Sequence, residues 1–170
     1  MKIKNIILAI ALVAFVIITR LLPHISNFTP IFAIGIFAAY TFKNRWISIL
    51  LPISAMFLSD IFLGFYPEIW AVYLSMAIAH FMNYKFAQSN KAKNIAISSF
   101  VAPTIFFILS NLAVFASWYP HTIVGLSECY ISALPFYGAT LVSTFAFSFL
   151  IWGVFGYSKA NNNQTIIEKI

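Results

Sequence analysis

The side chains most capable of chemistry gather between residues 111 and 136, in the stretch NLAVFASWYPHTIVGLSECYISALPF. This stretch holds the single cysteine of the chain, Cys129, together with His121 and the aromatic pair Trp118 and Tyr119. A nucleophilic cysteine needs a base beside it and a group that orients the base. The spacing between His121 and Cys129 guarantees neither, so covalent catalysis is the weakest of the functions that this stretch allows. Binding of a small molecule uses the same residue types and demands less of their geometry.

Prolines bracket the same stretch, because Pro120 and Pro135 each limit how far a helix can continue. Gly125 gives it one conformationally free position. The pattern predicts a stiff, lid-like loop that closes over a bound solute. Trp118 and Tyr119 would supply its apolar walls. Directional contacts would come from three of its polar side chains and one flanking aromatic: Asn111, His121, Cys129 and Tyr130.

A carboxylate lies inside an apolar run at Asp60, within residues 47–64. A charge within a membrane-spanning segment is costly unless it is paired or hydrated, which makes Asp60 a candidate for contact with a solute. A structural ion pair with Arg20 is the other interpretation, because both residues are predicted at the same side of the membrane. The sequence leaves both open.

Composition places the chain in the membrane. Hydrophobic residues make up 62% of it, charged residues 8%, and the mean hydropathy is +0.92. The hydrophobic share and the mean hydropathy are higher, and the charged share is lower, than in a soluble domain. The net charge of +6 does not indicate nucleic acid, because the cations are scattered at the ends of apolar runs. A phosphate-binding glycine–lysine loop of the Walker type is absent from the sequence, and a lone cysteine offers no metal-ligand pair. We expect no cofactor and no metal.

Apolar runs set the architecture. The sequence predicts an all-α fold, a polytopic bundle of six transmembrane helices at residues 5–22, 29–42, 47–64, 68–84, 95–116 and 136–157. Residues 1–158 would form a single domain, followed by a polar cytoplasmic tail at residues 159–170. Membrane lipid is therefore the first expected partner.

Two small residues, Gly35 and Ala39, stand four apart on the second predicted helix. Such spacing lets two helix backbones approach closely. It indicates either packing inside the bundle or a surface that packs against a partner protein.

The distribution of Lys and Arg predicts the orientation. Nine of the ten cations fall at the two ends of the chain and in alternate turns, and Arg20 alone falls on the other side. Cations concentrate on the cytoplasmic side, so both termini should be cytoplasmic. Three outward-facing segments would then hold the candidate ligand-binding residues, which are Arg20, Asn27, Asp60, Asn111, Trp118, Tyr119, His121, Cys129 and Tyr130. Such a mixture of donors, acceptors and aromatic rings is typical of a pocket for a small polar or aromatic ligand. Single aromatic residues at these positions are also typical of the interfacial belt of a membrane protein.

Several motifs resemble those of a known family. The pieces RLLPHISNFTP, FLSDIFLGFY, NLAVF and YPHTIVGLSECYISALPF are similar to a bacterial family of small six-helix membrane proteins of unassigned function. That family resembles the substrate-binding S components of energy-coupling factor (ECF) transporters. The resemblance implies capture of a vitamin-like solute, with a transmembrane coupling subunit and a pair of cytoplasmic ATPases as partners. S components carry their small-residue spacing on the first helix, whereas this chain carries it at Gly35 and Ala39.

The expected function is therefore that of a solute-binding or transport subunit in a bacterial plasma membrane, without enzymatic activity. A structural or assembly protein whose outer loops bind another protein is the alternative.

Overall fold

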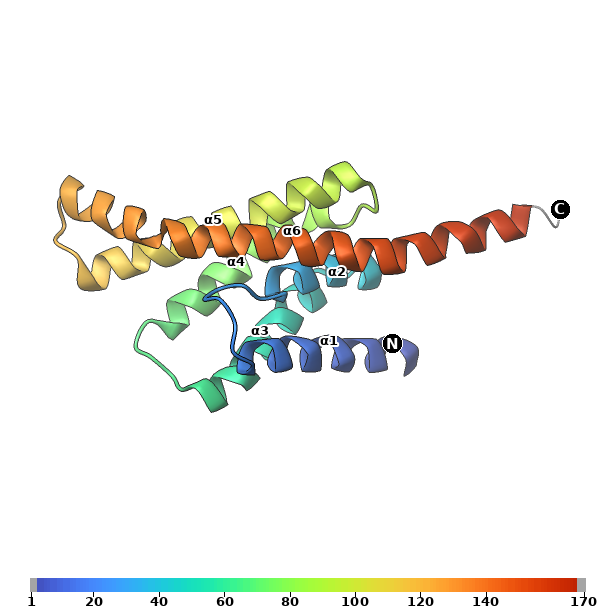
Figure 1. Ribbon diagram of the computed structural model, residues 1–170, viewed down its shortest axis with the longest axis horizontal. Helices are drawn as coiled ribbons and strands as arrows, with labels where there is room; N and C mark the ends of the chain where they lie inside the picture. Colours follow the sequence, from blue (N-terminus) through green and yellow to red (C-terminus); the bar gives the residue numbers. More distant parts are fainter. Residues whose placement is uncertain (1–2, 168–170) are drawn as a thin grey trace.

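The structure is a computed structural model that describes residues 3–167, with side chains described as far as Val154. These residues form six α-helices (Figure 1): α1 (Ile3–Leu21), α2 (Ile31–Phe42), α3 (Arg45–Leu63), α4 (Ile69–Ala87), α5 (Ala92–Trp118) and α6 (Ile123–Ile167). The predicted all-α fold with six helices is confirmed. Helix α6 continues past residue 158, into the segment predicted as a tail.

The short helix α2 is the centre of the bundle. It contacts all five other helices, and nine of its twelve residues are buried. The long helices α5 and α6 pack along one side of it, and α1 with α3 pack along the other (Figure 1). The main core cluster forms around Phe32 and Ile34 of α2 and includes Val16, Ala55 and Met76. Because α2 is apolar on every side, it is a core element and not an amphipathic surface helix.

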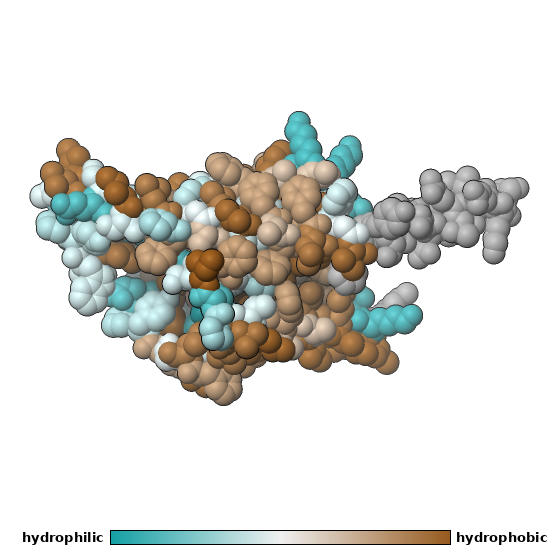
Figure 2. Space-filling model, in the orientation of Figure 1, coloured by the Kyte–Doolittle hydropathy of each residue, from teal (hydrophilic) through white to brown (hydrophobic). Residues whose placement is uncertain are grey.

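Four of the described helices are long and apolar enough to cross a membrane: α1, α3, α5 and the part of α6 from Ile123 to Val154. Helix α2 is apolar but shorter, and α4 carries more polar residues. Figure 2 shows hydrophobic side chains over the middle of the molecule, with hydrophilic side chains toward its two ends. This distribution identifies the chain as a membrane protein, while six full crossings stay a prediction.

Local signals set the helix boundaries. Asn44 caps α3 by accepting hydrogen bonds from the backbone N–H groups of Trp46 and Ile47 at 2.9 and 3.3 Å. Lys43, just before it, takes a left-handed conformation with φ 49° and closes α2. Gly64 ends α3 with φ 97°, a conformation that favours glycine. Each turn is therefore encoded by the residues within it.

The predicted long loop at residues 116–136 is wrong. Helix α5 continues to Trp118, a turn of four residues follows at 119–122, and α6 begins at Ile123. Pro135 lies inside α6. A proline removes one backbone hydrogen bond, and membrane helices tolerate this when neighbouring helices support them. The turn is tight, because a side chain at Gly125 would overlap the carbonyl oxygen of Pro120. A lid is therefore not what this stretch forms.

Charged side chains distinguish the two ends of the bundle. The turns α2–α3 and α4–α5 carry Lys43, Arg45, Lys91 and Lys93, and they lie at the same end as the N-terminus. We call this the basic end. The turns α1–α2, α3–α4 and α5–α6 belong to the opposite end, where Arg20 lies in the last turn of α1.

Candidate functional site

Arg20 and Asp60 form an ion pair near the end of the bundle opposite the basic end. Arg20 Nη2 lies 2.7 Å from Asp60 Oδ1, and the two side chains are 15% and 2% exposed. Arg20 Nη1 also donates to the hydroxyl of Ser59 at 2.7 Å and to the carbonyl of Met56 at 3.1 Å. The structural ion pair is therefore present. Asp60 itself is almost fully buried, and contact of its carboxylate with a solute stays a prediction.

Two tyrosines complete the environment of Asp60. The hydroxyl of Tyr73 donates to Asp60 Oδ2 at 2.7 Å, so both carboxylate oxygens are bonded. Tyr66 lies in the α3–α4 turn, outside the spanning helices. Burial raises the pKa of Tyr66, and the negative charge of Asp60 raises it further. Tyr66 is therefore a neutral hydroxyl at physiological pH and can donate a hydrogen bond.

Two adjoining cavities lie beside this ion pair. Their volumes are about 350 and 450 Å³, and they share Arg20, Asn27, Met56, Phe106 and Thr140 as lining residues. We call the two cavities together the vestibule. Helices α1, α3, α5 and α6 and the α1–α2 loop all contribute to its walls. Among its described lining residues Arg20 is the one with a permanent charge.

An aromatic wall closes one side of the vestibule. Phe107 of α5 stacks on Tyr137 of α6, with ring centroids 4.5 Å apart and planes at 23°. Tyr137 also shares a hydrogen bond of 2.7 Å with the hydroxyl of Thr104. Both rings line the larger cavity, and Phe106 lines both cavities. The hydrogen bond and the stacking fix the wall in place before any ligand arrives.

Three of the predicted site residues line the vestibule: Arg20, Asn27 and Asn111. Asn27 lies in the α1–α2 loop with φ 62°, a left-handed conformation that asparagine tolerates. Asn111 donates through Nδ2 to the carbonyl of Phe107, one turn earlier in α5, at 2.8 Å. The predicted intramembrane amide is therefore held within its own helix, and it still belongs to the cavity wall.

Three other predicted residues lie at the α5–α6 turn, outside the vestibule lining. Trp118 is 67% exposed, and its ring N–H donates to the carboxylate of Glu68 at 2.7 Å. His121 packs on Phe115 and contacts the carbonyl of Ala116 at 3.1 Å. Tyr119 caps the end of α5. These residues join the ends of α4, α5 and α6, which is a structural role.

Cys129 and Tyr130 connect α6 to α5. Cys129 is 2% exposed, and its thiol contacts the carbonyl of Asn111 at 3.4 Å. The hydroxyl of Tyr130 donates to the carbonyl of Ile108 at 2.7 Å. Both bonds reach backbone carbonyls in the second half of α5. Neither residue lines the vestibule, so their predicted contacts with a solute have no geometric support.

Gly35 and Ala39 pack inside the chain. Gly35 is buried, and a side chain at this position would overlap the imidazole of His80. Ala39 is 1% exposed and belongs to a small cluster with Tyr84 and Ala87 of α4. The close helix approach predicted from their spacing is therefore made with α4. Use of this pair by a partner protein would require a rearranged α2.

Sequence reasoning missed several vestibule residues, above all Phe106, Phe107 and Tyr137. The doublet Phe106–Phe107 follows Pro103 in an apolar run, and such a run looks the same whether it faces lipid or a cavity. His80 of α4 also received no role from the sequence; it is 3% exposed and stacks on Phe32, with ring centroids 5.4 Å apart.

The whole chain was also compared with known proteins. Residues 1–165 match a family described as a family of unknown function, DUF6580. The chain belongs to this family. No curated protein and no solved structure shows a significant match. The membership in DUF6580 agrees with the predicted resemblance to a family of unassigned function, and it leaves the activity to be argued from the geometry.

The chemical groups of the vestibule and of the α5–α6 turn can be compared with what metal binding, nucleophilic catalysis and ligand binding each need. No group of three or more His, Cys, Asp or Glu side chains that could hold a metal occurs among the described residues. Cys129 and His121 make their contacts with backbone carbonyls and not with each other. The vestibule combines neutral hydrogen-bonding groups with aromatic rings around one guanidinium, as in sites for small polar molecules.

Proposed function

We propose that this member of DUF6580 is a membrane-embedded binding protein that takes a small solute into the vestibule. The observation that carries this proposal is the pair of adjoining cavities, about 350 and 450 Å³, lined by both Arg20 and a fixed aromatic wall. Cavities of this size fall in the range of sites for small molecules. A site whose walls are already held by internal bonds loses little entropy when it binds.

Charge narrows the class of solute. The guanidinium of Arg20 is compensated by Asp60 at 2.7 Å, so the pair carries no net charge. The remaining lining groups are amides, hydroxyls and apolar side chains, with His24 as a further ring donor or acceptor. A charged solute would lose hydration without gaining a counter-ion. A neutral molecule with hydrogen-bonding groups on one side and a flat apolar part on the other fits better.

Arg20 can still make a directional contact with such a solute. A guanidinium has five N–H donors, and three of the contacts of Arg20 are already defined, to Met56, Ser59 and Asp60. The other donors can reach a carbonyl or a ring nitrogen. Because Arg20 is held by its three partners, the contact is pre-oriented.

The proposed cellular setting follows the cation distribution. The basic end would face the cytoplasm and the vestibule would open outward, with the protein in a bacterial plasma membrane. The resemblance to S components of ECF transporters extends the proposal to delivery of the solute to a coupling subunit and ATPases. This extension rests on the sequence resemblance alone.

The test is mass spectrometry of small molecules that stay bound to the protein purified in mild detergent. We expect a neutral compound that is retained by the unaltered chain and by Phe100→Ala, a matched control on α5 whose ring is 51% exposed. Phe106→Ala should lose most of the compound, because Phe106 lines both cavities. Loss of one large aromatic contact typically costs about 2 kcal/mol, or roughly thirtyfold in affinity.

Two outcomes would count against the proposal. Equal retention by Phe106→Ala and Phe100→Ala would show that the compound binds elsewhere. Absence of any retained compound, combined with stoichiometric recovery of one protein partner, would favour the alternative of a structural or assembly protein.

A further inference from the structure

Unpaired polar atoms gather in the half of the bundle toward the basic end. Among the described residues, six buried side-chain atoms have no hydrogen-bond partner: His80 Nε2, Asn83 Nδ2, Asn83 Oδ1 and the hydroxyl oxygens of Ser98, Ser99 and Ser148. Their residues are at most 5% exposed. Buried polar groups are normally bonded, and each exception asks for an explanation. Here all six lie on the three helices α4, α5 and α6.

The connectivity brings three of these residues to one level of the bundle and places His80 nearly one turn beyond it. Helices α4 and α5 are antiparallel neighbours, and Ala87 of α4 and Ile95 of α5 line the same small cavity. One helical turn further from that cavity, α4 presents Asn83 and α5 presents Ser98 and Ser99. His80 follows after nearly one more turn of α4.

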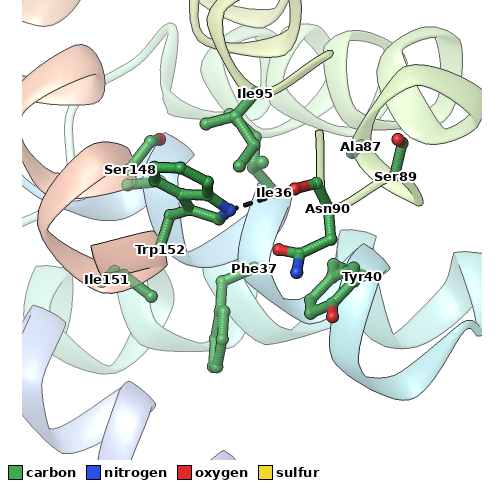
Figure 3. Close-up of a pocket in the computed structure, with 11 residues that line it drawn as sticks. Ile36, Phe37, Tyr40, Ala87, Ser89, Asn90, Ile95, Ser148, Ile151 and Trp152 are labelled. Atoms are coloured by element: carbon green, nitrogen blue, oxygen red, sulfur yellow. Dashed lines mark hydrogen bonds between the residues drawn. The ribbon is translucent and has the colours of Figure 1, made fainter. Parts of the chain in front are cut away.

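The small cavity is lined by Ala87 of α4 and Ile95 of α5, and Figure 3 shows the side chains around it. Its volume is about 30 Å³, and Ser148, Asn90, Ile36 and Trp152 are among its lining residues. We call it the inner cavity. The ring N–H of Trp152 donates to the backbone carbonyl of Asn90 at 3.1 Å, which closes one side. A space of this size accepts a water molecule and excludes the solutes that the vestibule could hold.

The chemistry of the unpaired atoms selects the occupant. Asn83 offers a donor and an acceptor, and each serine hydroxyl can act as either. The set contains no carboxylate that would balance the charge of a metal cation, and an anion would find no positive partner there. Water donates and accepts at once, so it can bond to every member of the set.

The same level also reaches the vestibule. His80 stacks on Phe32, which lines the vestibule, and Met76, one turn before His80 on α4, lines it as well. On the other side, Ile36 lines the inner cavity next to Gly35, which contacts His80. The four side chains therefore lie between the inner cavity and the vestibule.

We infer that His80, Asn83, Ser98 and Ser99 form an internal water-binding site that extends to Ser148 at the inner cavity. This site is a hydrated region between α4, α5 and α6. The ring of Phe32, which stacks on His80 and lines the vestibule, separates the hydrated region from the vestibule. The inference is independent of the solute proposed for the vestibule.

The direction of a stability change tests the inference. If the hydroxyl of Ser99 is unpaired, Ser99→Ala removes a buried orphan and should raise the melting temperature. If water bonds to it, Ser99→Ala leaves the water and its other partners poorly satisfied. We then expect a decrease of about 2–4 °C, the shift typical of one lost interaction in a chain of this size.

The matched control is Ser143→Ala, because Ser143 is also fully buried in a helix but already donates to the carbonyl of Thr140 at 3.0 Å. It corrects for the higher helix propensity of alanine. A rise in melting temperature for Ser99→Ala relative to Ser143→Ala would overturn the inference.

Hydroxyl-radical labelling of the unaltered protein supplies a second readout that needs no variant. Radicals generated from ¹⁸O-labelled water modify side chains next to water, including buried ones that touch bound water. We expect His80 to be labelled despite its 3% exposure, with exposed His24 as the positive reference. Labelling of His24 without labelling of His80 would refute the water site.

Discussion

Removal of the Asp60 carboxylate should destabilise the protein strongly, and replacement of the whole ion pair should not. Asp60→Ala deletes two hydrogen bonds of 2.7 Å, from Arg20 and Tyr73, and it leaves the Arg20 guanidinium without a counter-ion at 15% exposure. Breaking a buried pair in this way typically costs about 3–5 kcal/mol. For a chain of this length that corresponds to a decrease of roughly 6–20 °C in melting temperature.

The double variant Arg20→Met/Asp60→Leu removes both charges and keeps apolar volume in their place. Such replacements are often neutral or stabilising by about 1–4 kcal/mol. We expect its melting temperature to return close to that of the unaltered protein, although the vestibule loses its guanidinium. The assay is the fraction of monodisperse protein that remains after heating in detergent.

A clear result would refute this reasoning. If Asp60→Ala and the double variant both melt within about 2 °C of the unaltered protein, the carboxylate is hydrated and its burial in the structure does not persist. If the double variant falls as far as Asp60→Ala, the pair contributes through its bonds to Met56, Ser59 and Tyr73 more than through charge compensation.

Three further predictions concern packing, orientation and the α5–α6 turn. Gly35→Ala should destabilise by about 1–3 kcal/mol because the new methyl group overlaps His80, whereas Gly138→Ala, with open space around it, should not; equal melting temperatures would contradict this packing. A cysteine placed at Lys91 should react only with thiol reagents that reach the cytoplasm, in a background where buried Cys129 is replaced by serine, and reaction from the outside would reverse the proposed orientation. Trp118→Ala should leave retention of the solute unchanged, since Trp118 contacts Glu68 outside the vestibule; a large loss of bound compound would restore the lid hypothesis.

The sequence predicted most helices because their boundaries depend on local residues. Asn44 and Gly64 mark ends that short-range rules can read, and the apolar runs between them are long. The prediction for the α5–α6 region was wrong, and the reason is also physical. Pro135 and the polar residues before it are typical of a loop in water, but a helix packed against α5 satisfies its own backbone and tolerates them.

Long-range contacts explain what could be predicted of the site. The ion pair of Arg20 and Asp60 was one of two interpretations of their charge and expected depth, because few groups in an apolar bundle can neutralise a carboxylate. Asn111 was singled out as an isolated amide within an apolar run. The aromatic wall could not be predicted, since the stacking of Phe107 on Tyr137 depends on the register between α5 and α6. Hydropathy carries no information about that register.

The shortness of α2 has a consequence for the electric field across the membrane. Its twelve residues span about 18 Å, against a hydrocarbon thickness of roughly 30 Å. If α2 crosses the membrane, the polar α1–α2 loop, with Asn27 and Thr29 at the vestibule, lies below the lipid surface, where such backbone is tolerated only beside a cavity. A water-filled vestibule would concentrate the transmembrane voltage over the protein beneath it. Moving one charge through the full potential changes the energy by about 2.3 kcal/mol per 100 mV. Occupancy by an ionic compound would consequently vary with voltage, whereas a neutral one would bind equally well in energised and de-energised membranes.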